Sequence, residues 1–423
     1  MTDDDTTRRY SRRDYLRVGG VLTGTGLLTG CLGGDSAGST ATETGTVTDT
    51  ATSAPATDEE TESKPTTTAD EGPYSVELSP VGEVAFEQPP ERAMVAFSHY
   101  ADMAVALGQA DTVQTLYAPE FAGKSLNTFY DRLDGVSLEW EGLPDPLGDG
   151  VDKEQLYELD SDVHFIDPSY VVGAQEGWDP SDVTEVAENV GPWFGNYHSG
   201  LHDQPADPYA EDYRYYTLWD LFEKVAAVYR ERERYEALRA VHDDLLSTIQ
   251  SSLPPASERP TAARVTLIGG TFYAYKLNAP GFWHADTRPL GATDAFADVE
   301  WEGTWGRFDY ETMLETDPDV ILHLWGMAPG YYIDDIRETV TDDPVGSQLS
   351  AIQNDRFFAG GVRFQGPIAN LFQLEMTAKQ LYPDQFGEWP GYDPGQPYPE
   401  IPTDEQLFDR QRVADIVTGD SSA

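Results

Sequence analysis

The residues in this sequence best suited to bind a ligand are aromatic side chains and an arginine that follow predicted strands. In the N-terminal half they are His99, Tyr100, Tyr117 and Tyr170. In the C-terminal half they are Tyr273, Tyr275, Trp325, Arg363 and Phe364. Loops at the carboxyl ends of strands form the binding crevice of open α/β sheets, so we expect these side chains to line a cleft. Aromatic faces suit a flat, partly apolar ligand, and Arg363 is the first choice to offset negative charge on it.

A second group of candidate ligands lies in residues 191–216, a stretch rich in aromatic residues. Imidazole and carboxylate groups bind zinc, which makes His198, His202 and Asp203 candidates for a metal site. Gly200 stands between the two histidines and disfavours the regular helix that would align them. We therefore predict no metal site, and we expect this stretch to lie over the cleft.

Motifs of known enzymes give little support for catalysis. The sequence has no Gly-x-x-x-x-Gly-Lys phosphate loop and no His-Glu-x-x-His zinc motif. Pairs of carboxylates, which could indicate a glycosidase, carry no weight in a chain with 75 acidic residues. We predict that the protein is not an enzyme, and a secreted enzyme remains the less favoured alternative.

An internal repeat organises the elements that would position these residues. Residues 151–163 recur as residues 308–320, and the matched acids are Asp152 and Asp309, Glu154 and Glu311, Glu158 and Glu315, Asp160 and Asp317, and Asp162 and Asp319. Each copy predicts an aspartate N-cap, a short helix, an Asp-x-Asp turn and an apolar strand. The strands are expected at residues 163–166 and 320–322. The repeat therefore predicts two similar α/β lobes.

The longest helical pattern covers residues 217–252, where apolar residues recur mostly at spacings of three and four. A helix of this length would measure roughly 50 Å, enough to reach across both lobes. Pro254 and Pro255 end the pattern. The expected domains are an N-terminal lobe at 74–216, the interlobe helix at 217–252, a C-terminal lobe at 253–390 and a tail at 391–423.

The first residues carry signals for export and anchoring. Ser11 to Arg17, which includes Arg12 and Arg13, precedes a short apolar run and resembles the twin-arginine export signal. Leu28-Thr29-Gly30-Cys31 resembles a lipobox, and Cys31 is the only cysteine in the chain. The apolar run is too short to span a bilayer. We expect a signal peptide at 1–30, a lipid on Cys31, and a flexible Thr- and acid-rich tether at 31–73.

The net charge of −48 is extreme, and it extends over the part of the chain that is expected to fold. Such a surface repels nucleic acid and anionic lipid. Its many acids and few lysines resemble proteins from organisms that live in high salt, where dense charges are screened. We therefore expect a haloarchaeal lipoprotein at the extracellular face of the cell membrane.

Two α/β lobes joined by one long helix, behind an anchor and a tether, resemble one protein family. It comprises the solute-binding proteins of the iron-siderophore and cobalamin class, which deliver ligands to ATP-binding-cassette (ABC) importers. The resemblance covers residues 80–387. It also rests on the strand and loop at Pro90–Asp102 and on the closing strand and helix between Gln348 and Pro383. It implies the class III periplasmic-binding-protein fold, with two Rossmann-like lobes and one long interlobe helix.

The same resemblance implies function and partners. The ligand would be a ferric-siderophore chelate, held without a cofactor by a monomer, and the partners would be an ABC permease and its ATPase. Glu154 and Glu311 match the two glutamates, one on each lobe, that meet arginines of the permease in this family. Cobalamin, haem and a bare zinc, manganese or iron ion remain alternative ligands.

Overall fold

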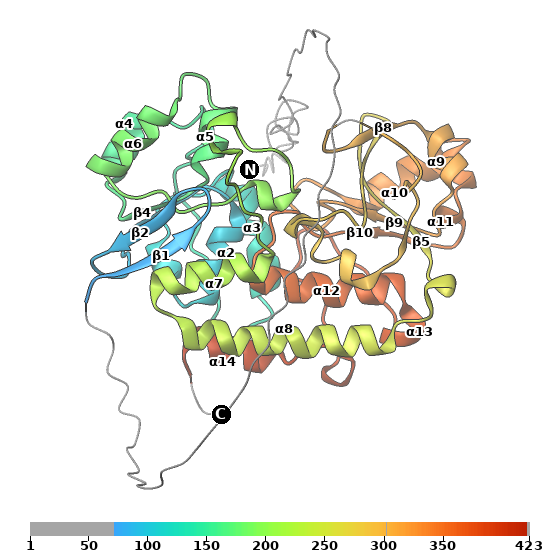
Figure 1. Ribbon diagram of the computed structural model, residues 1–423. Coiled ribbons are helices and arrows are strands. Elements are labelled where there is room, and N and C mark those ends of the chain that lie inside the picture. Colours follow the sequence, from blue (N-terminus) through green and yellow to red (C-terminus); the bar gives the residue numbers. More distant parts are fainter. Residues whose placement is uncertain (1–71, 302, 421–423) are drawn as a thin grey trace, which may run out of the picture. The chain divides into compact units, whose positions relative to one another are not determined.

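The computed structural model describes residues 72–301 and 303–420, and within them the chain forms two α/β lobes (Figure 1). The expected export signal at Arg12 and Arg13, and the lipid site at Cys31, lie outside the described residues. No helix in the described ranges is long and apolar enough to cross a membrane.

The N-terminal lobe is centred on two short parallel strands, β3 (Ala93–Val95) and β4 (Val163–Phe165). Single bridges add Val113 beside β3 and Trp193 beside β4. An antiparallel hairpin of β1 (Tyr74–Leu78) and β2 (Gly82–Phe86) completes the strands of this lobe. Its helices are α2 (Ser98–Ala106), α3 (Pro119–Tyr130), α4 (Lys153–Leu159), α5 (Pro168–Ala174) and α6 (Pro180–Asn189).

The C-terminal lobe contains a six-stranded mixed sheet. Its order is β10-β9-β5-β6-β8, and β7 also pairs with β5. The strands are β5 (Thr261–Ile268), β6 (Thr271–Tyr275), β7 (Thr293–Asp294), β8 (Gly306–Phe308), β9 (Val320–His323) and β10 (Phe357–Ala359). The helices are α9 (Tyr310–Thr316), α10 (Ile333–Asp342), α11 (Ser350–Gln353), α12 (Pro367–Leu381) and α13 (Pro383–Phe386).

The two copies of the sequence repeat form the same structure, which confirms that prediction. Asp152 accepts a hydrogen bond from the backbone of α4, and Asp309 accepts one from the backbone of α9. Each short helix then ends at an aspartate with positive φ, Asp160 or Asp317. The following aspartates bind the backbone that leads into the neighbouring strand: Asp162 accepts from Arg92 N at 2.9 Å, and Asp319 accepts from Thr261 N at 2.8 Å. Most of the matched acids therefore hold each lobe together.

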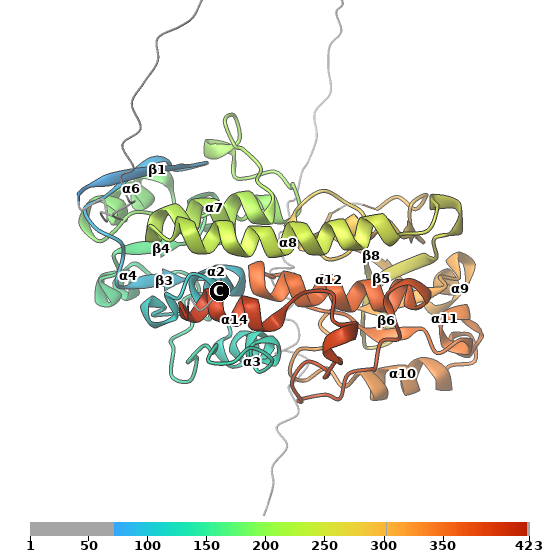
Figure 2. The same cartoon turned by 90° about the horizontal axis from the view of Figure 1, so that it is seen from below.

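The prediction of a single helix over residues 217–252 is wrong in one respect, because the chain forms two helices there. They are α7 (Leu218–Tyr229) and α8 (Arg232–Ser252), separated by Arg230 in the left-handed conformation at φ 57°. The break falls among the five residues that separate the buried residues Tyr229 and Tyr235. The two helices pack against each other, and α8 alone, about 30 Å long, runs along both lobes (Figures 1 and 2).

The segment predicted as a C-terminal tail, residues 391–423, is packed against the lobes over its described part. Its helix α14 (Arg410–Thr418) lies against α8 (Figure 2). Tyr398 is fully buried, and its backbone N–H donates to Thr128 O of α3 at 2.7 Å. Glu375 of α12, also fully buried, accepts from Arg410 at 2.7 Å. Every residue of α12 is buried, and the helix contacts α2 and α3 of the N-terminal lobe as well as α8 and α13.

Candidate functional site

Several of the predicted ligand residues converge where the two lobes meet, and Phe97, which was not predicted, lies among them. Phe97 and His99 follow β3, Tyr170 lies in α5 after β4, Trp325 follows β9, and Arg363 with Phe364 follows β10. Each of these strands belongs to a parallel pair, β3 with β4 or β9 with β10. The carboxyl ends of parallel strands lie at one edge of a sheet, and here the two edges face each other at the junction.

Arg363 lies at the centre of this junction, surrounded by aromatic rings of the C-terminal lobe. Its guanidinium carbon is 4.4 Å from the ring centroid of Trp283, 4.8 Å from that of Phe364 and 5.5 Å from that of Trp325. The residue is only 3% exposed. A cation held over aromatic faces is attracted by their quadrupoles, by about 2 kcal/mol or more where it is desolvated.

The guanidinium of Arg363 retains unused donors. Its Nε and Nη2 atoms are buried and make no hydrogen bond. No carboxylate in residues 72–301 or 303–420 forms an ion pair with it. The Nε and Nη2 hydrogens of an arginine point in the same direction and match two oxygens of one acceptor. The arrangement is therefore suited to bind a ligand that presents paired, negatively charged oxygens.

Aromatic rings of the two lobes meet directly around Arg363. The ring centroids of Phe97 and Phe364 are 4.9 Å apart, and those of Tyr197 and Trp283 are 5.8 Å apart. Tyr170 packs on the N-terminal side, 4.5 Å from Tyr197. We call these side chains the junction cluster, which comprises Phe97, Tyr170, Tyr197, Trp283, Trp325, Arg363 and Phe364. Aromatic faces of this kind can hold a flat, partly apolar group.

The tyrosines of the cluster are neutral hydrogen-bonding groups at ordinary pH. Burial raises the pKa of Tyr170 and of Tyr197, and the positive charge of Arg363 opposes part of this effect. The pKa of Tyr275 in β6 is raised by burial and opposed by Arg363 in the same way. These phenols therefore add donors and acceptors near the arginine without adding negative charge.

His99 is buried beside the cluster, and neither of its ring nitrogens has a hydrogen-bond partner. Its ring centroid lies 5.2 Å from that of Phe282 and 6.0 Å from that of Phe364, both in the C-terminal lobe. Burial lowers the pKa of His99 to about 3, so the ring is neutral. His99 can therefore offer one donor and one acceptor to a polar group.

The other candidates have different surroundings. Tyr117 is half-buried, with its ring centroid 6.2 Å from that of Phe97. Tyr100 lies inside the N-terminal lobe, where its hydroxyl accepts from Asn196 N at 2.8 Å, so its packing is structural. Tyr273 and Tyr275 lie on a second strand, β6, and not on a loop. Tyr273 contacts Arg307, whose guanidinium carbon is 5.6 Å from its ring centroid.

Trp325 adopts an unusual backbone conformation for a large residue, with φ at 70°. Its backbone N–H donates to Gly361 O at 2.8 Å, which ties the loop after β9 to the loop that carries Arg363. Positive φ at a bulky residue costs free energy and concentrates at functional sites. The strain is consistent with a ring positioned for binding.

Sequence reasoning did not single out Phe97, Tyr197 or Trp283. Phe97 lies at the end of the strand predicted after Pro90, and Tyr197 lies within residues 191–216, which are predicted to cover the cleft. Trp283 follows Pro280 and Gly281 in a loop that no predicted strand preceded. The aromatic pair Phe282-Trp283 directly after a Pro-Gly turn was the one available signal for it.

Residues 191–216 reach from the N-terminal lobe to the C-terminal lobe. The 3-10 turn at His198–Gly200 contacts the turn at Phe282–His284. A Cβ atom on Gly281 would lie 2.2 Å from Gly200 O, so only glycine permits this approach. His198 Nδ1 lies 3.1 Å from Asp203 Oδ1, while His202 stacks on Tyr215. In the described residues, no group of three or more His, Cys, Asp or Glu side chains is placed to hold a metal.

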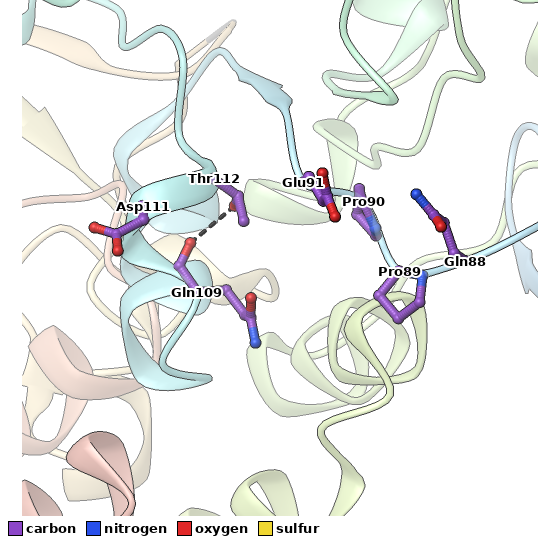
Figure 3. Close-up of a pocket in the computed structure, with 7 residues that line it drawn as sticks. All are labelled: Gln88, Pro89, Pro90, Glu91, Gln109, Asp111 and Thr112. Atoms are coloured by element: carbon purple, nitrogen blue, oxygen red, sulfur yellow. Dashed lines mark hydrogen bonds between the residues drawn. The ribbon is translucent and has the colours of Figure 1, made fainter. Parts of the chain in front are cut away.

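A separate pocket lies at the other end of β3 (Figure 3). Gln88, Pro89, Pro90, Glu91, Gln109, Asp111 and Thr112 line it. Inside it Thr112 Oγ1 donates to Gln109 O at 2.8 Å. No residue of the junction cluster takes part, and no cation lines the pocket. It is therefore distinct from the candidate site.

Glu154 and Glu311 occupy equivalent positions in the first turns of α4 and α9, and both are exposed. The helix α4 leads into β4, and α9 leads into β9, so the start of each helix lies near the carboxyl edge of its sheet. Neither glutamate makes an ion pair with another described residue. Unlike Asp152 and Asp162, Glu154 and Glu311 have no structural role in the described part of the chain.

No protein-family model and no curated protein matches this sequence. Solved structures do match. A periplasmic binding protein from Veillonella parvula aligns with a TM-score of 0.51 at 15% identity, over 73% of this chain and 97% of that one. An iron uptake ABC transporter substrate-binding protein from Streptococcus pneumoniae aligns with a TM-score of 0.50 at 15% identity, over 71% and 96%.

A periplasmic solute binding protein from Mycobacterium smegmatis aligns at 16% identity with a TM-score of 0.50, over 74% of this chain and 98% of that one. Nearly all of each solved chain is covered, so the likeness extends over both lobes. At these identities it establishes the fold. The predicted fold class, two α/β lobes joined by a helix as in periplasmic solute-binding proteins, is confirmed.

Proposed function

We propose that this chain, which has the fold of the periplasmic solute-binding proteins, is a receptor that delivers a ferric-siderophore-type chelate to an ABC importer. The observation that carries the proposal is Arg363, buried among aromatic rings of the junction cluster with two donors unpaired. A ferric chelate of catecholate or hydroxamate type offers flat faces to the rings and negatively charged oxygens to the arginine. The protein binds and releases this ligand, and no residue is assigned a catalytic role.

The rings that touch across the junction must separate to admit such a ligand. Phe97 and Phe364 belong to different lobes, as do Tyr197 and Trp283. Two further features oppose a wide opening: α8 runs along both lobes, and α12 is buried between them. We therefore expect a modest movement of the lobes.

The partners proposed for this receptor are a permease and its ATPase. Glu154 and Glu311 are the docking candidates, because they stand exposed at matching positions on the two lobes. Carboxylates at such positions attract cationic groups of a partner and set the orientation of docking. The resemblance of these positions to the family's paired glutamates supports the same assignment.

Charge reversal tests the docking proposal. Glu154→Lys combined with Glu311→Lys should lower ligand-stimulated ATP hydrolysis by the reconstituted importer about tenfold, while ligand affinity stays unchanged. Glu188→Lys with Glu338→Lys is the matched control, because these exposed acids lie on α6 and α10 of the same two lobes. Equal losses in both double variants would show that bulk charge, and not these two positions, governs docking.

We propose further that the receptor is exported by the twin-arginine route and held at the extracellular membrane face by a lipid on Cys31. The support is the sequence pattern around Arg12, Arg13 and Cys31, followed by a Thr-rich segment of about 40 residues. Replacing Cys31 with serine should release the protein into the medium. Replacing Arg12 and Arg13 with lysine should leave it unexported.

Tryptophan fluorescence provides the direct test of ligand binding, because Trp283 and Trp325 flank Arg363. The purified full chain, kept in molar salt because of its acidic surface, would be titrated with a ferric tricatecholate, a ferric trihydroxamate, cobalamin, haemin and zinc. Saturable quenching by one ferric chelate, lost in Arg363→Met and kept in Arg412→Met, supports the proposal. Quenching only by cobalamin, haemin or zinc would replace the siderophore with that ligand, and no response to any of them would overturn siderophore uptake.

A further inference from the structure

Asp102 is a fully buried acid of the N-terminal lobe that contacts the C-terminal segment of the chain. It lies in α2, one turn after Ser98. Its Oδ2 atom accepts from Ala369 N at 2.9 Å, and Ala369 lies in the first turn of α12. Its Oδ1 atom accepts from Tyr130 of α3, whose hydroxyl oxygen is 2.6 Å away. The carboxylate therefore joins α2, α3 and α12.

Asp102 supplies the side-chain acceptor that the N-cap position of α12 lacks. The residue at the N-cap position is Gly366, and no side chain of its own segment caps the helix. The first backbone N–H groups of a helix need acceptors, and a negative charge at this end also interacts favourably with the helix dipole. Here the acceptor comes from 267 residues away in the sequence.

The segment that α2 holds in this way carries the ligand arginine. Arg363 and Phe364 lie between β10 and α12. Ser98 Oγ donates to Phe364 O at 2.9 Å, so α2 binds this segment on both sides of Gly366. A Cβ atom on Gly366 would lie 2.6 Å from Asp102 Cβ and 2.7 Å from His99 O, which shows how closely the two backbones approach.

We propose that Asp102, assisted by Ser98, is a positioning residue that fixes the Arg363 segment against the N-terminal lobe and thereby presents the arginine to the ligand. The assignment rests on the proposed function for its effect on binding. Asp102 does not belong to the junction cluster, and it acts through the backbone of residues 364–369.

Substitutions at one position separate the hydrogen bonds of Asp102 from its shape. Asp102→Asn keeps an oxygen for Ala369 N–H, and its amide can donate to the Tyr130 hydroxyl, which is able to accept. Asp102→Leu has a similar size but offers no acceptor. We expect Asp102→Asn to bind the best ferric chelate of the fluorescence titration within about twofold of wild type, and Asp102→Leu to bind it about tenfold more weakly.

A matched control distinguishes positioning from a general loss of stability. Glu375 is a second fully buried acid on α12, and it binds Arg410, Tyr398 and the backbone of Leu407 instead of α2. Glu375→Gln should lower the unfolding temperature without changing chelate affinity by more than about twofold. Equal affinity of Asp102→Leu and Asp102→Asn would overturn the proposal, as would an affinity loss in Glu375→Gln that matches the one in Asp102→Leu.

Amide hydrogen exchange tests the same contact without any ligand, and so independently of the proposed function. In Ser98→Ala, a mild change at a partly buried position, the amides of residues 360–369 should exchange at least about threefold faster than in wild type. Amides of residues 410–418 should be unaffected. Unchanged exchange in 360–369 in both Ser98→Ala and Asp102→Leu would overturn the positioning role even if every chelate titration gave a signal. If no chelate binds to wild type, faster exchange in these variants would still support the positioning of the segment.

Discussion

Arg363 and Arg410 are both buried beneath three aromatic rings, yet only Arg410 has a carboxylate partner. The guanidinium of Arg410 lies 5.2 Å from the centroid of Phe372, 5.3 Å from that of Tyr398 and 5.9 Å from that of Phe408. It also donates to Glu375 Oε1 at 2.7 Å. Arg363 has a similar set of rings and no acid in the described chain.

The difference indicates that the two arginines have different roles. An unpaired buried charge is costly, so a fold that needs an arginine only for packing supplies its counter-charge. Glu375 meets that need for Arg410. At the junction the protein leaves the counter-charge out, and we infer that a ligand supplies it. Acidic residues are abundant in residues 72–301 and 303–420, and none of them there forms an ion pair with Arg363.

The largest effect is expected from breaking the paired arginine. Arg410→Met keeps an apolar stem under the rings but leaves Glu375 buried without its cation. Removal of one partner of a buried ion pair costs about 3–5 kcal/mol of stability. Denaturant unfolding in constant salt would measure the loss, and Arg412→Met, an exposed arginine of the same helix, should change stability by less than about 0.5 kcal/mol. A loss below 1 kcal/mol in Arg410→Met would contradict the structural role of the pair.

The opposite pattern is expected at the junction. Arg363→Met removes a buried charge that has no carboxylate partner among the described residues, so stability should stay the same or rise. Affinity for the ferric chelate should fall about 100-fold, equivalent to about 2.7 kcal/mol. Unfolding and titration of one preparation give both numbers. A variant that loses stability as Arg410→Met does would show that Arg363 is also a structural arginine.

Asp102 extends the comparison to a buried acid without a cation. Its hydrogen-bond partners are the neutral Tyr130 and the backbone at the start of α12, and no charged side chain among the described residues shifts its pKa. Burial raises the pKa of Asp102 to about 7, while hydrogen bonds from Tyr130 and from α12 oppose the shift. The folded state therefore binds a proton more tightly than the unfolded state, whose carboxyl has its ordinary pKa near 4.

This shift gives a pH dependence with a definite sign. Stability contributed by Asp102 is fully present below about pH 4 and is lost as pH rises through about 7. Asp102→Asn cannot ionise, so its stability relative to wild type should increase by at least about 1 kcal/mol between pH 4 and pH 8. Unfolding curves of the two proteins at several pH values check this, and a constant difference would contradict a raised pKa.

The smallest expected effect concerns the rings themselves. Trp283→Leu removes the closest cation–π contact of Arg363 and should weaken chelate binding about threefold to tenfold. Phe408→Leu is the counterpart beside Arg410 and should lower stability by about 1 kcal/mol without changing affinity. If both variants lower stability alone, or both lower chelate affinity, the rings around Arg363 and those around Arg410 do not differ in function.

Local signals in the sequence predicted much of the fold. The N-caps at Asp152 and Asp309, and the turns at Asp160 and Asp317, depend on residues within a few positions of each other. The strands that precede Tyr170, Trp325 and Arg363 also depend on neighbouring residues in the sequence, which is why they could be predicted. The break between α7 and α8 was missed because Arg230, which adopts positive φ there, is neither glycine nor asparagine. Packing of the two helices overrides the preference of that residue.

The sequence by itself determined the two lobes, a long helical region between them, and the loops that carry Trp325, Arg363 and Phe364. Only the tertiary structure decided which arginine has an acid beside it, because Arg410 and Glu375 are 35 residues apart and Asp102 and Ala369 are 267 apart. Charge pairing and the capping of α12 depend on distance in space. Nothing in the sequence indicates which of the 75 acidic residues will lie beside a given arginine.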